Sequence, residues 1–270
     1  MMEIFTTELV EGSFHAASAS RDVDFRVLAP ADRAPGERLP LVLHLHGAMS
    51  SAASLEQARP LYDEAIARGA FPRAVVACAS TPTRGGFYVD GPGGRWEAVV
   101  GADFPAHLAA RFGPLGPTAL IGASMGGYGA LKLAFAEPER YAAVAALSPV
   151  VFPGETPDGV PARALPSLLG ELHEAMSLGS GDPATYAANS VYGRARAHAD
   201  RIRAARLPVL VDCGGADEFR LYEGAEYLHG VLDGLAVEHT YRLVPGAGHV
   251  GPESAARTAD AIAFVGRALG

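Results

Sequence analysis

Short apolar runs separated by stretches of helical periodicity make up most of this chain. An uninterrupted run of this kind is typical of a strand that is buried on both faces of a sheet. Such runs occur at residues 41–45, 74–78, 119–121, 141–147 and 207–213, with weaker β character at 4–10, 23–28 and 237–244. Helical spacing of apolar residues occurs at 54–68, 96–112, 127–135, 218–235 and 252–269. This alternation predicts an α/β fold with a mostly parallel central sheet flanked by helices.

Residues 151–206 interrupt the alternation. They are rich in Pro, Gly, Ala and Ser, with short helical pieces such as 165–176 and 184–206. We interpret this segment as a short, cap-like helical insertion that lies over the ends of the strands. Because we find no internal repeat and no interdomain linker, we expect residues 1–270 to form a single domain.

The strand predicted at 119–121 leads directly into a sharp turn and a helix. The turn, Gly122-Ala-Ser124-Met-Gly126, matches the G-x-S-x-G pattern of a nucleophile elbow. Glycine is expected on either side of the serine, because a strained turn brings these two positions close together and a Cβ there would clash. The pattern alone is weak in a chain with 32 glycines. It predicts Ser124 as a nucleophile only if a base, an acid and an oxyanion hole are also present.

A base and an acid follow Ser124 in the chain order that this pattern requires. His249 lies in a glycine-rich loop after the last predicted strand, at the edge of the sheet where ligands bind in α/β folds. The acid is expected after the preceding strand. Asp217 follows a Gly-Gly turn there, which allows its carboxylate to reach the imidazole of His249. Asp212 and Glu218 are the alternatives for the acid.

The oxyanion hole is expected to consist of two backbone amides. One is the amide that follows the nucleophile, at Met125. The other belongs to the loop after the strand at 41–45, where Ala48 is the first choice and Met49 the second. We also expect His46, Gly47 and Met49 of this loop to contact the substrate.

Neither a cofactor nor a metal ion is expected. His44 and His46 are two positions apart on a strand, but no third ligand follows nearby. Gly246-x-Gly248-x-x-Gly251 matches the dinucleotide-binding fingerprint, but the chain ends before a second strand with an acidic residue.

The composition excludes several other classes of protein. A formal net charge of −8 over 270 residues argues against nucleic acid as a partner. Without a basic amphipathic helix or a long apolar run, we expect no association with a membrane. The N-terminus has no signal-peptide pattern, so we expect a cytoplasmic protein. Cys78 and Cys213 each lie in an apolar run, which favours buried free thiols over a disulfide.

The chain resembles the esterase D / antigen 85 / feruloyl esterase branch of the α/β-hydrolases from about residue 23 to 253. The resemblance rests on Phe87-Tyr-Val-Asp90, Arg95-Trp-Glu97, Asp103-Phe-Pro105 and Ile121-Gly-Ala-Ser-Met-Gly-Gly-Tyr-Gly-Ala130. It implies the α/β-hydrolase fold and puts the acid at Asp217. The chain departs from the branch after His249, where no aromatic residue follows soon. It also departs after Gly47, where the cysteine-containing pattern of S-formylglutathione hydrolases is missing. These departures leave the acyl chain and the alcohol undetermined.

We also predict roles for two segments that do not include Ser124, Asp217 or His249. We expect Trp96 to pack behind the elbow and Glu97 to favour a helix N-terminus. The alternative is that the loop at 87–90 lines the substrate cleft. The insertion is expected to form the acyl pocket, with Leu168, Leu169, Met176 and Tyr186 as its lining.

Together these residues predict a serine carboxylic ester hydrolase that acts on a small-molecule ester through an acyl-enzyme intermediate. An acyltransferase, which passes the acyl group to an alcohol other than water, is the alternative within catalysis. A non-catalytic binding protein on the same fold is the alternative from another class. Whether the chain forms a homo-oligomer is left open by the sequence.

Overall fold

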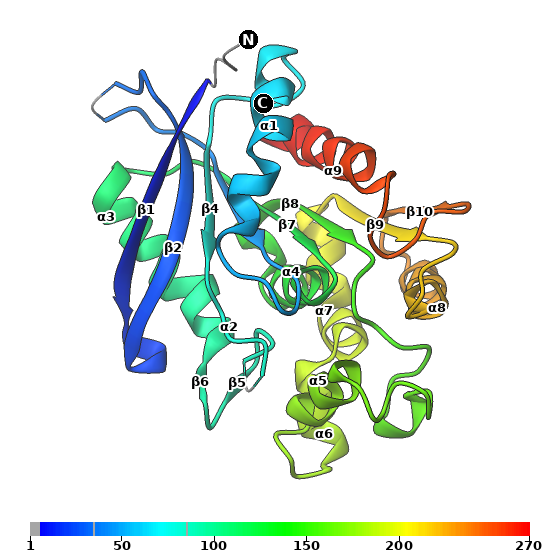
Figure 1. Ribbon diagram of the computed structural model, residues 1–270. Helices are drawn as coiled ribbons and strands as arrows, with labels where there is room; N and C mark the ends of the chain where they lie inside the picture. The colour runs from blue at the N-terminus through cyan, green and yellow to red at the C-terminus, as the bar shows by residue number, and fades with distance from the viewer. Residues whose placement is uncertain (1–5, 35, 85) are drawn as a thin grey trace.

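A sheet of eight strands forms the centre of the computed structural model, which describes residues 6–34, 36–84 and 86–270 (Figure 1). Its strands are β1 (Thr7–Ala16), β2 (Arg21–Pro30), β3 (Leu41–Leu45), β4 (Val75–Ala79), β7 (Thr118–Ala123), β8 (Tyr141–Leu147), β9 (Val209–Gly214) and β10 (Thr240–Val244). Their order in space is β1-β2-β4-β3-β7-β8-β9-β10. The β1–β2 and β2–β4 pairs are antiparallel, and every pair from β4 to β10 is parallel. The predicted mostly parallel sheet is therefore confirmed, while residues 4 and 5 of the first predicted strand lie outside the described residues.

Helices cover both faces of this sheet. α1 (Ser54–Ala67) and α9 (Ser254–Leu269) pack together on one face, and α3 (Phe104–Phe112), α4 (Met125–Ala136) and α8 (Leu221–Gly234) lie on the other (Figure 1). A π-helical turn at Val99–Asp103 joins α3 to the short α2 (Trp96–Ala98). The strands β5 (Asp90–Gly91) and β6 (Gly94–Arg95) pair with each other just before α2. None of the helices in the described part of the chain is long and apolar enough to cross a bilayer.

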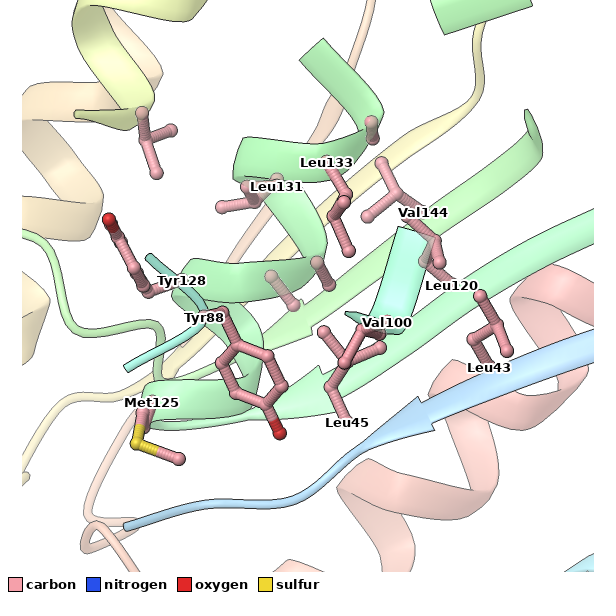
Figure 2. Packing of buried hydrophobic residues seen from close by; sticks show 14 of the residues in the cluster. Leu43, Leu45, Tyr88, Val100, Leu120, Met125, Tyr128, Leu131, Leu133 and Val144 are labelled. Atoms are coloured by element: carbon pink, nitrogen blue, oxygen red, sulfur yellow. The ribbon is translucent and has the colours of Figure 1, made fainter. Parts of the chain in front are cut away.

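The central strands are apolar throughout because both of their faces are buried. In β3, Leu41 and Leu43 belong to the core beneath α4, whereas Val42 belongs to the core beneath α1 and α9. Helix α4 is also buried, because it lies between the sheet and the helix α7 (Val191–Ala205). Figure 2 shows Leu133 of α4 close to the strand residues Leu120 and Val144, whereas Tyr128 and Leu131 extend from the opposite side of the helix. Cys78 in β4 and Cys213 in β9 are buried free thiols, as the sequence predicts.

The insertion contains α5 (Leu168–Met176) and α6 (Pro183–Asn189) in addition to α7. The prediction of one helical piece at 184–206 is wrong. This segment forms two helices, because α6 ends at Asn189 and Ser190 is the N-cap of α7. Its Oγ accepts the amide of Gly193 at 2.9 Å. Helices α5 and α6 lie at the same end of the molecule as β5 and β6, which follow the carboxyl end of β4 (Figure 1). The insertion therefore lies at the end of the sheet where the predicted site residues are located.

A group of three charges, one fully buried and two partly buried, connects α2, α4 and α7. The carboxylate of Glu97 lies 2.9 Å from Nζ of Lys132, and its two oxygens accept bonds from Arg194 at 3.0 Å each. Lys132 is completely buried and also donates to the carbonyl of Tyr88 at 3.0 Å. Trp96 is buried, with its indole nitrogen donating to the carbonyl of Gly93 at 3.3 Å, and Glu97 lies in the first turn of α2, as expected. The carboxylate of Glu97 is nevertheless used for ion pairing, which the helix-terminus interpretation did not include.

The pKa values of the group follow from burial and pairing. Burial alone raises the pKa of Glu97, but Lys132 and Arg194 outweigh burial and hold it below its ordinary value. Burial lowers the pKa of Lys132 even though Glu97 opposes this effect. The carboxylate of Glu97 is therefore the group that neutralises the charges of both Lys132 and Arg194.

Replacement of Glu97 by glutamine leaves the buried Lys132 and the partly buried Arg194 close together without the carboxylate that pairs with both. We expect Glu97→Gln to lower the free energy of unfolding by about 3 kcal/mol. The matched control is Glu139→Gln, which removes a solvent-exposed pair with Arg201 and should cost far less stability. Urea unfolding followed by circular dichroism measures both variants. Equal costs for the two variants would contradict a structural role for the buried group.

Candidate active site

The strand β7 leads into α4 through a sharp turn at Ser124. The turn requires glycine at positions 122 and 126, two residues before and after the serine. Ser124 has φ 57° and ψ −119°, which is a strained conformation for a residue with a side chain. A Cβ on Gly122 would lie 2.3 Å from the carbonyl oxygen of Gly126. A Cβ on Gly126 would lie 2.0 Å from the carbonyl oxygen of Leu45 in the neighbouring strand. The clash expected from the sequence is therefore present, and it also involves β3.

Three side chains from different loops form one hydrogen-bonded chain. Nε2 of His249 lies 3.0 Å from Oγ of Ser124, and Nδ1 of His249 lies 2.7 Å from Oδ2 of Asp217. Because an ionised carboxylate can only accept, Nδ1 carries the hydrogen and Nε2 is left to accept the hydroxyl proton of the serine. Asp217 is buried, and its other oxygen accepts the amide of Phe219 at 2.9 Å. The carboxylate is thus fixed in place before any substrate binds.

The other two candidates for the acid have different partners. Asp212 is completely buried, and its two oxygens accept from Nε of Arg257 at 2.6 Å and Nε of Arg242 at 2.5 Å. Glu218 accepts the backbone amide of His249 at 2.9 Å, so it holds the loop rather than the imidazole. Of the three acids, the structure brings only Asp217 to Nδ1 of His249.

A cavity of about 260 Å³ opens beside Ser124. Its lining comes from four strand ends and α9, and consists of Gly47, Ala48, Ala123, Ser124, Leu147, Ser148, His249, Val250, Ser254, Arg257 and Thr258. Met125 is the first residue of α4, where backbone amides have no acceptor within the helix. Met49 differs from Ala48, because its amide donates to Oγ1 of Thr83 at 2.8 Å and its side chain is 81% exposed. The geometry therefore favours Ala48 over Met49 as the second amide donor.

His46 supports the loop from inside and does not line this cavity. Its ring is buried, with Nε2 accepting the amide of Thr81 at 2.9 Å and Nδ1 donating to the carbonyl of Gly47 at 2.8 Å. Burial lowers the pKa of His46, which keeps the ring neutral as these bonds require. The hydroxyl of Tyr88 donates to the carbonyl of His46 at 3.0 Å. In Figure 2, the Tyr88 side chain extends toward Leu45, at the end of β3.

The two histidines considered as metal ligands do not meet. His44 lies 3.2 Å from the hydroxyl of Tyr62, in the core beneath α1, whereas His46 contacts Thr81. Burial lowers the pKa of His44 to about 4. The neutral ring of His44 is therefore a core residue.

The insertion residues expected in the acyl pocket are not at the cavity beside Ser124. Met176 and Tyr186 are buried in the core beneath α4, and Leu168 and Leu169 pack partly buried against it. Helix α5 instead borders a separate cavity of about 430 Å³, together with the loop around Phe87. The loop at 87–90 thus faces this second cavity.

Several residues at the cavity were not identified from the sequence. Ser148 follows β8 directly, so its place at a strand end is the signal that could have revealed it. Arg257 lies on α9 and donates to Ser148 Oγ at 2.8 Å, to the carbonyl of Gly248 at 3.2 Å and to Asp212. Phe219 packs edge-on against the ring of His249 at 4.9 Å. No local pattern identifies Arg257 or Phe219, because both act through contacts between distant segments.

Comparison with known proteins agrees with this architecture. Residues 16–228 match the family described as "Putative esterase". A ferulic acid esterase has a similar structure, with a TM-score of 0.79 and 18% identity over 99% of this chain and 100% of that chain. An S-formylglutathione hydrolase from Agrobacterium tumefaciens has a TM-score of 0.78 and 22% identity, covering 100% and 98%. The MPT51 protein of Mycobacterium tuberculosis has a TM-score of 0.72 and 17% identity, covering 97% and 99%.

At these identities the structural likeness shows the α/β-hydrolase fold, as predicted. The resemblance to an esterase family is confirmed by the family match. The family match covers residues 16–228, which is most of the 270-residue chain, and it therefore shows the family as well as the fold. The chain therefore belongs to this esterase family.

Proposed function

We propose that this esterase hydrolyses a small-molecule carboxylic ester through an acyl-enzyme intermediate on Ser124. The observation that supports the proposal is the hydrogen-bonded chain from Ser124 through His249 to Asp217, beside an open cavity. This arrangement has the groups that acyl transfer needs: a nucleophile, a base that can accept its proton, and a buried acid that orients the base.

The proposed reaction begins with attack of Ser124 Oγ on the ester carbonyl while Nε2 of His249 takes the hydroxyl proton. The amides of Met125 and Ala48 stabilise the negative oxygen of the tetrahedral intermediate, each contributing on the order of 3 kcal/mol. Collapse of the intermediate expels the alcohol, which receives the proton from His249. Water then attacks the acyl-enzyme by the same route and releases the acid.

The cavity supports a small substrate. Its volume of about 260 Å³ is below the roughly 300–1,000 Å³ of pockets that enclose drug-sized ligands. The similar structures do not select an acyl group, because a ferulic acid esterase and an S-formylglutathione hydrolase are named for acyl groups of very different size. We therefore propose that the cavity encloses one side of the ester, either the acyl group or the alcohol.

The nucleophile can be tested directly. We expect Ser124→Ala to abolish both hydrolysis of short p-nitrophenyl esters and covalent labelling by a fluorophosphonate probe, because both need the serine oxygen. Free acid should be the main product when an alcohol is added in competition with water, whereas a new ester would indicate an acyltransferase. Wild-type protein that neither hydrolyses these esters nor reacts with the probe would overturn the proposed function.

The assignment of the acid can be tested with two neighbouring carboxylates. Asp217→Asn should lower kcat on the order of 10⁴-fold, because an amide at this position favours the wrong tautomer of the imidazole. Glu218→Gln is the matched control, since Glu218 contacts only the backbone of His249, and its kcat should fall far less. Steady-state kinetics with a p-nitrophenyl ester measures both variants. A larger loss in Glu218→Gln would reassign the acid.

The hydroxyl of Tyr88 is proposed to position the amide of Ala48 by holding the carbonyl of His46. We expect Tyr88→Phe to lower kcat roughly tenfold with little change in KM, because the amide matters mainly in the transition state.

Tyr128→Phe is the matched control for this prediction. Its hydroxyl is equally buried and donates to the carbonyl of Asn189 at 2.6 Å, away from the oxyanion loop. Each variant loses one buried hydrogen bond to a carbonyl, at a cost of about 1 kcal/mol of stability. If kcat falls equally in both variants, the effect of Tyr88 is one of stability alone.

A further inference from the structure

Two histidines and an aspartate meet where α8 approaches the start of β10, the last strand at one edge of the sheet (Figure 1). His229 and Asp233 are four residues apart on α8, so they lie on one face of the helix. His239 directly precedes β10. Among the residues that the structure describes, these three form the one group of ligand-type side chains whose donor atoms lie within 4.8 Å of one another.

The hydrogen bonds of His239 direct one lone pair into this group. Its Nδ1 lies 2.8 Å from the carbonyl of Val237, which can only accept, so Nδ1 carries the hydrogen. In the neutral ring, Nε2 is then an acceptor, and it lies 2.8 Å from Nδ1 of His229. A ring whose far nitrogen donates to a backbone carbonyl is the usual arrangement of a metal-binding histidine. A cation would take the place of the hydrogen that Nδ1 of His229 donates to Nε2 of His239, and this hydrogen would move to Nε2 of the His229 ring.

The ring of His229 is also held in place. Tyr241 stacks on it, with ring centroids 4.7 Å apart and an angle of 16° between the planes. The hydroxyl of Tyr241 donates to Glu226 at 2.8 Å, which fixes the stacked ring in turn. Asp233 approaches His229 Nε2 at 3.6 Å and supplies a negative charge on the solvent side. The group therefore has two oriented nitrogens and one carboxylate.

We propose that His229, Asp233 and His239 bind a divalent transition-metal cation of the zinc class. Imidazole nitrogen suits Zn²⁺, whereas Mg²⁺ and Ca²⁺ prefer oxygen ligands throughout. Bond lengths near 2.0–2.1 Å imply about 3.3 Å between two ligands of a tetrahedral site. The two nitrogens must therefore separate by roughly half an ångström, which the partly exposed side chain of His229 allows. Water completes the coordination.

The site is separate from the one that contains Ser124. His239 precedes β10 and His249 follows it, so the five-residue strand lies between them, a span of roughly 17 Å. A bound cation would join α8, which begins just after Asp217, to the strand that leads to His249. We therefore expect the cation to stabilise the protein without taking part in ester hydrolysis.

Titration of the full-length protein with ZnCl₂ in an isothermal calorimeter tests the proposal. Wild-type protein should bind one Zn²⁺, and a hundredfold excess over Kd should raise Tm by about 5 °C. His229→Gln and His239→Gln should each weaken binding at least tenfold and remove the shift in Tm. Both variants should keep the esterase activity of the wild type, which shows that they are folded.

His15→Gln is the matched control. His15 pairs with Asp22 at 3.0 Å on the surface, so it offers an imidazole and a carboxylate without a second imidazole. This variant should bind Zn²⁺ as the wild type does. The proposal is overturned if the wild type shows no saturable binding below roughly 1 mM, or if loss of His239 leaves the affinity unchanged.

Discussion

The close approach of three backbone segments around Ser124 is the constraint on which the rest of the structure depends. The carbonyl of Leu45 in β3 lies where a side chain at position 126 would be, and the carbonyl of Gly126 lies where one at position 122 would be. Helix α4 can therefore start directly above the sheet, with its first amide next to the serine. The same contact brings the end of β3, and with it the loop at Gly47 and Ala48, to the turn.

Burial of α4 keeps this arrangement rigid. The helix is covered by the sheet on one side and by α7 on the other, so its one charged residue, Lys132, must be neutralised inside the protein. Glu97 supplies the counter-charge, and Lys132 also holds the carbonyl of Tyr88. Phe87 and Tyr88 both have positive φ values, which are unfavourable for large side chains. The ion pair behind α4 is thus connected, through Tyr88 and the carbonyl of His46, to the loop at Gly47 and Ala48.

Much of the fold and the core of the site could be predicted because both rest on local patterns. Apolar runs marked the parallel strands, and the G-x-S-x-G turn, the chain order and the strand ends pointed to Ser124, Asp217 and His249. The remaining features depend on contacts that no local pattern records. The ion pair of Glu97 with Lys132 and the position of Arg257 at the cavity each join segments far apart in the chain. The insertion misled for the same reason, since apolar residues such as Met176 and Tyr186 look alike whether they fill a core or line a pocket.

The distance along the chain between Ser124 and His249 has a consequence for folding. The two residues are 125 positions apart, and His249 follows β10, which lies at one edge of the sheet and comes after the other strands in the sequence. Contacts of such long range form slowly, because the chain must close a large loop before they contribute to stability. During synthesis, β3, β7 and α4 emerge from the ribosome well before β10 and α9. The turn at Ser124 can therefore form before His249 reaches it, and the hydrogen-bonded chain from Ser124 to Asp217 is completed only when the segment after β10 docks.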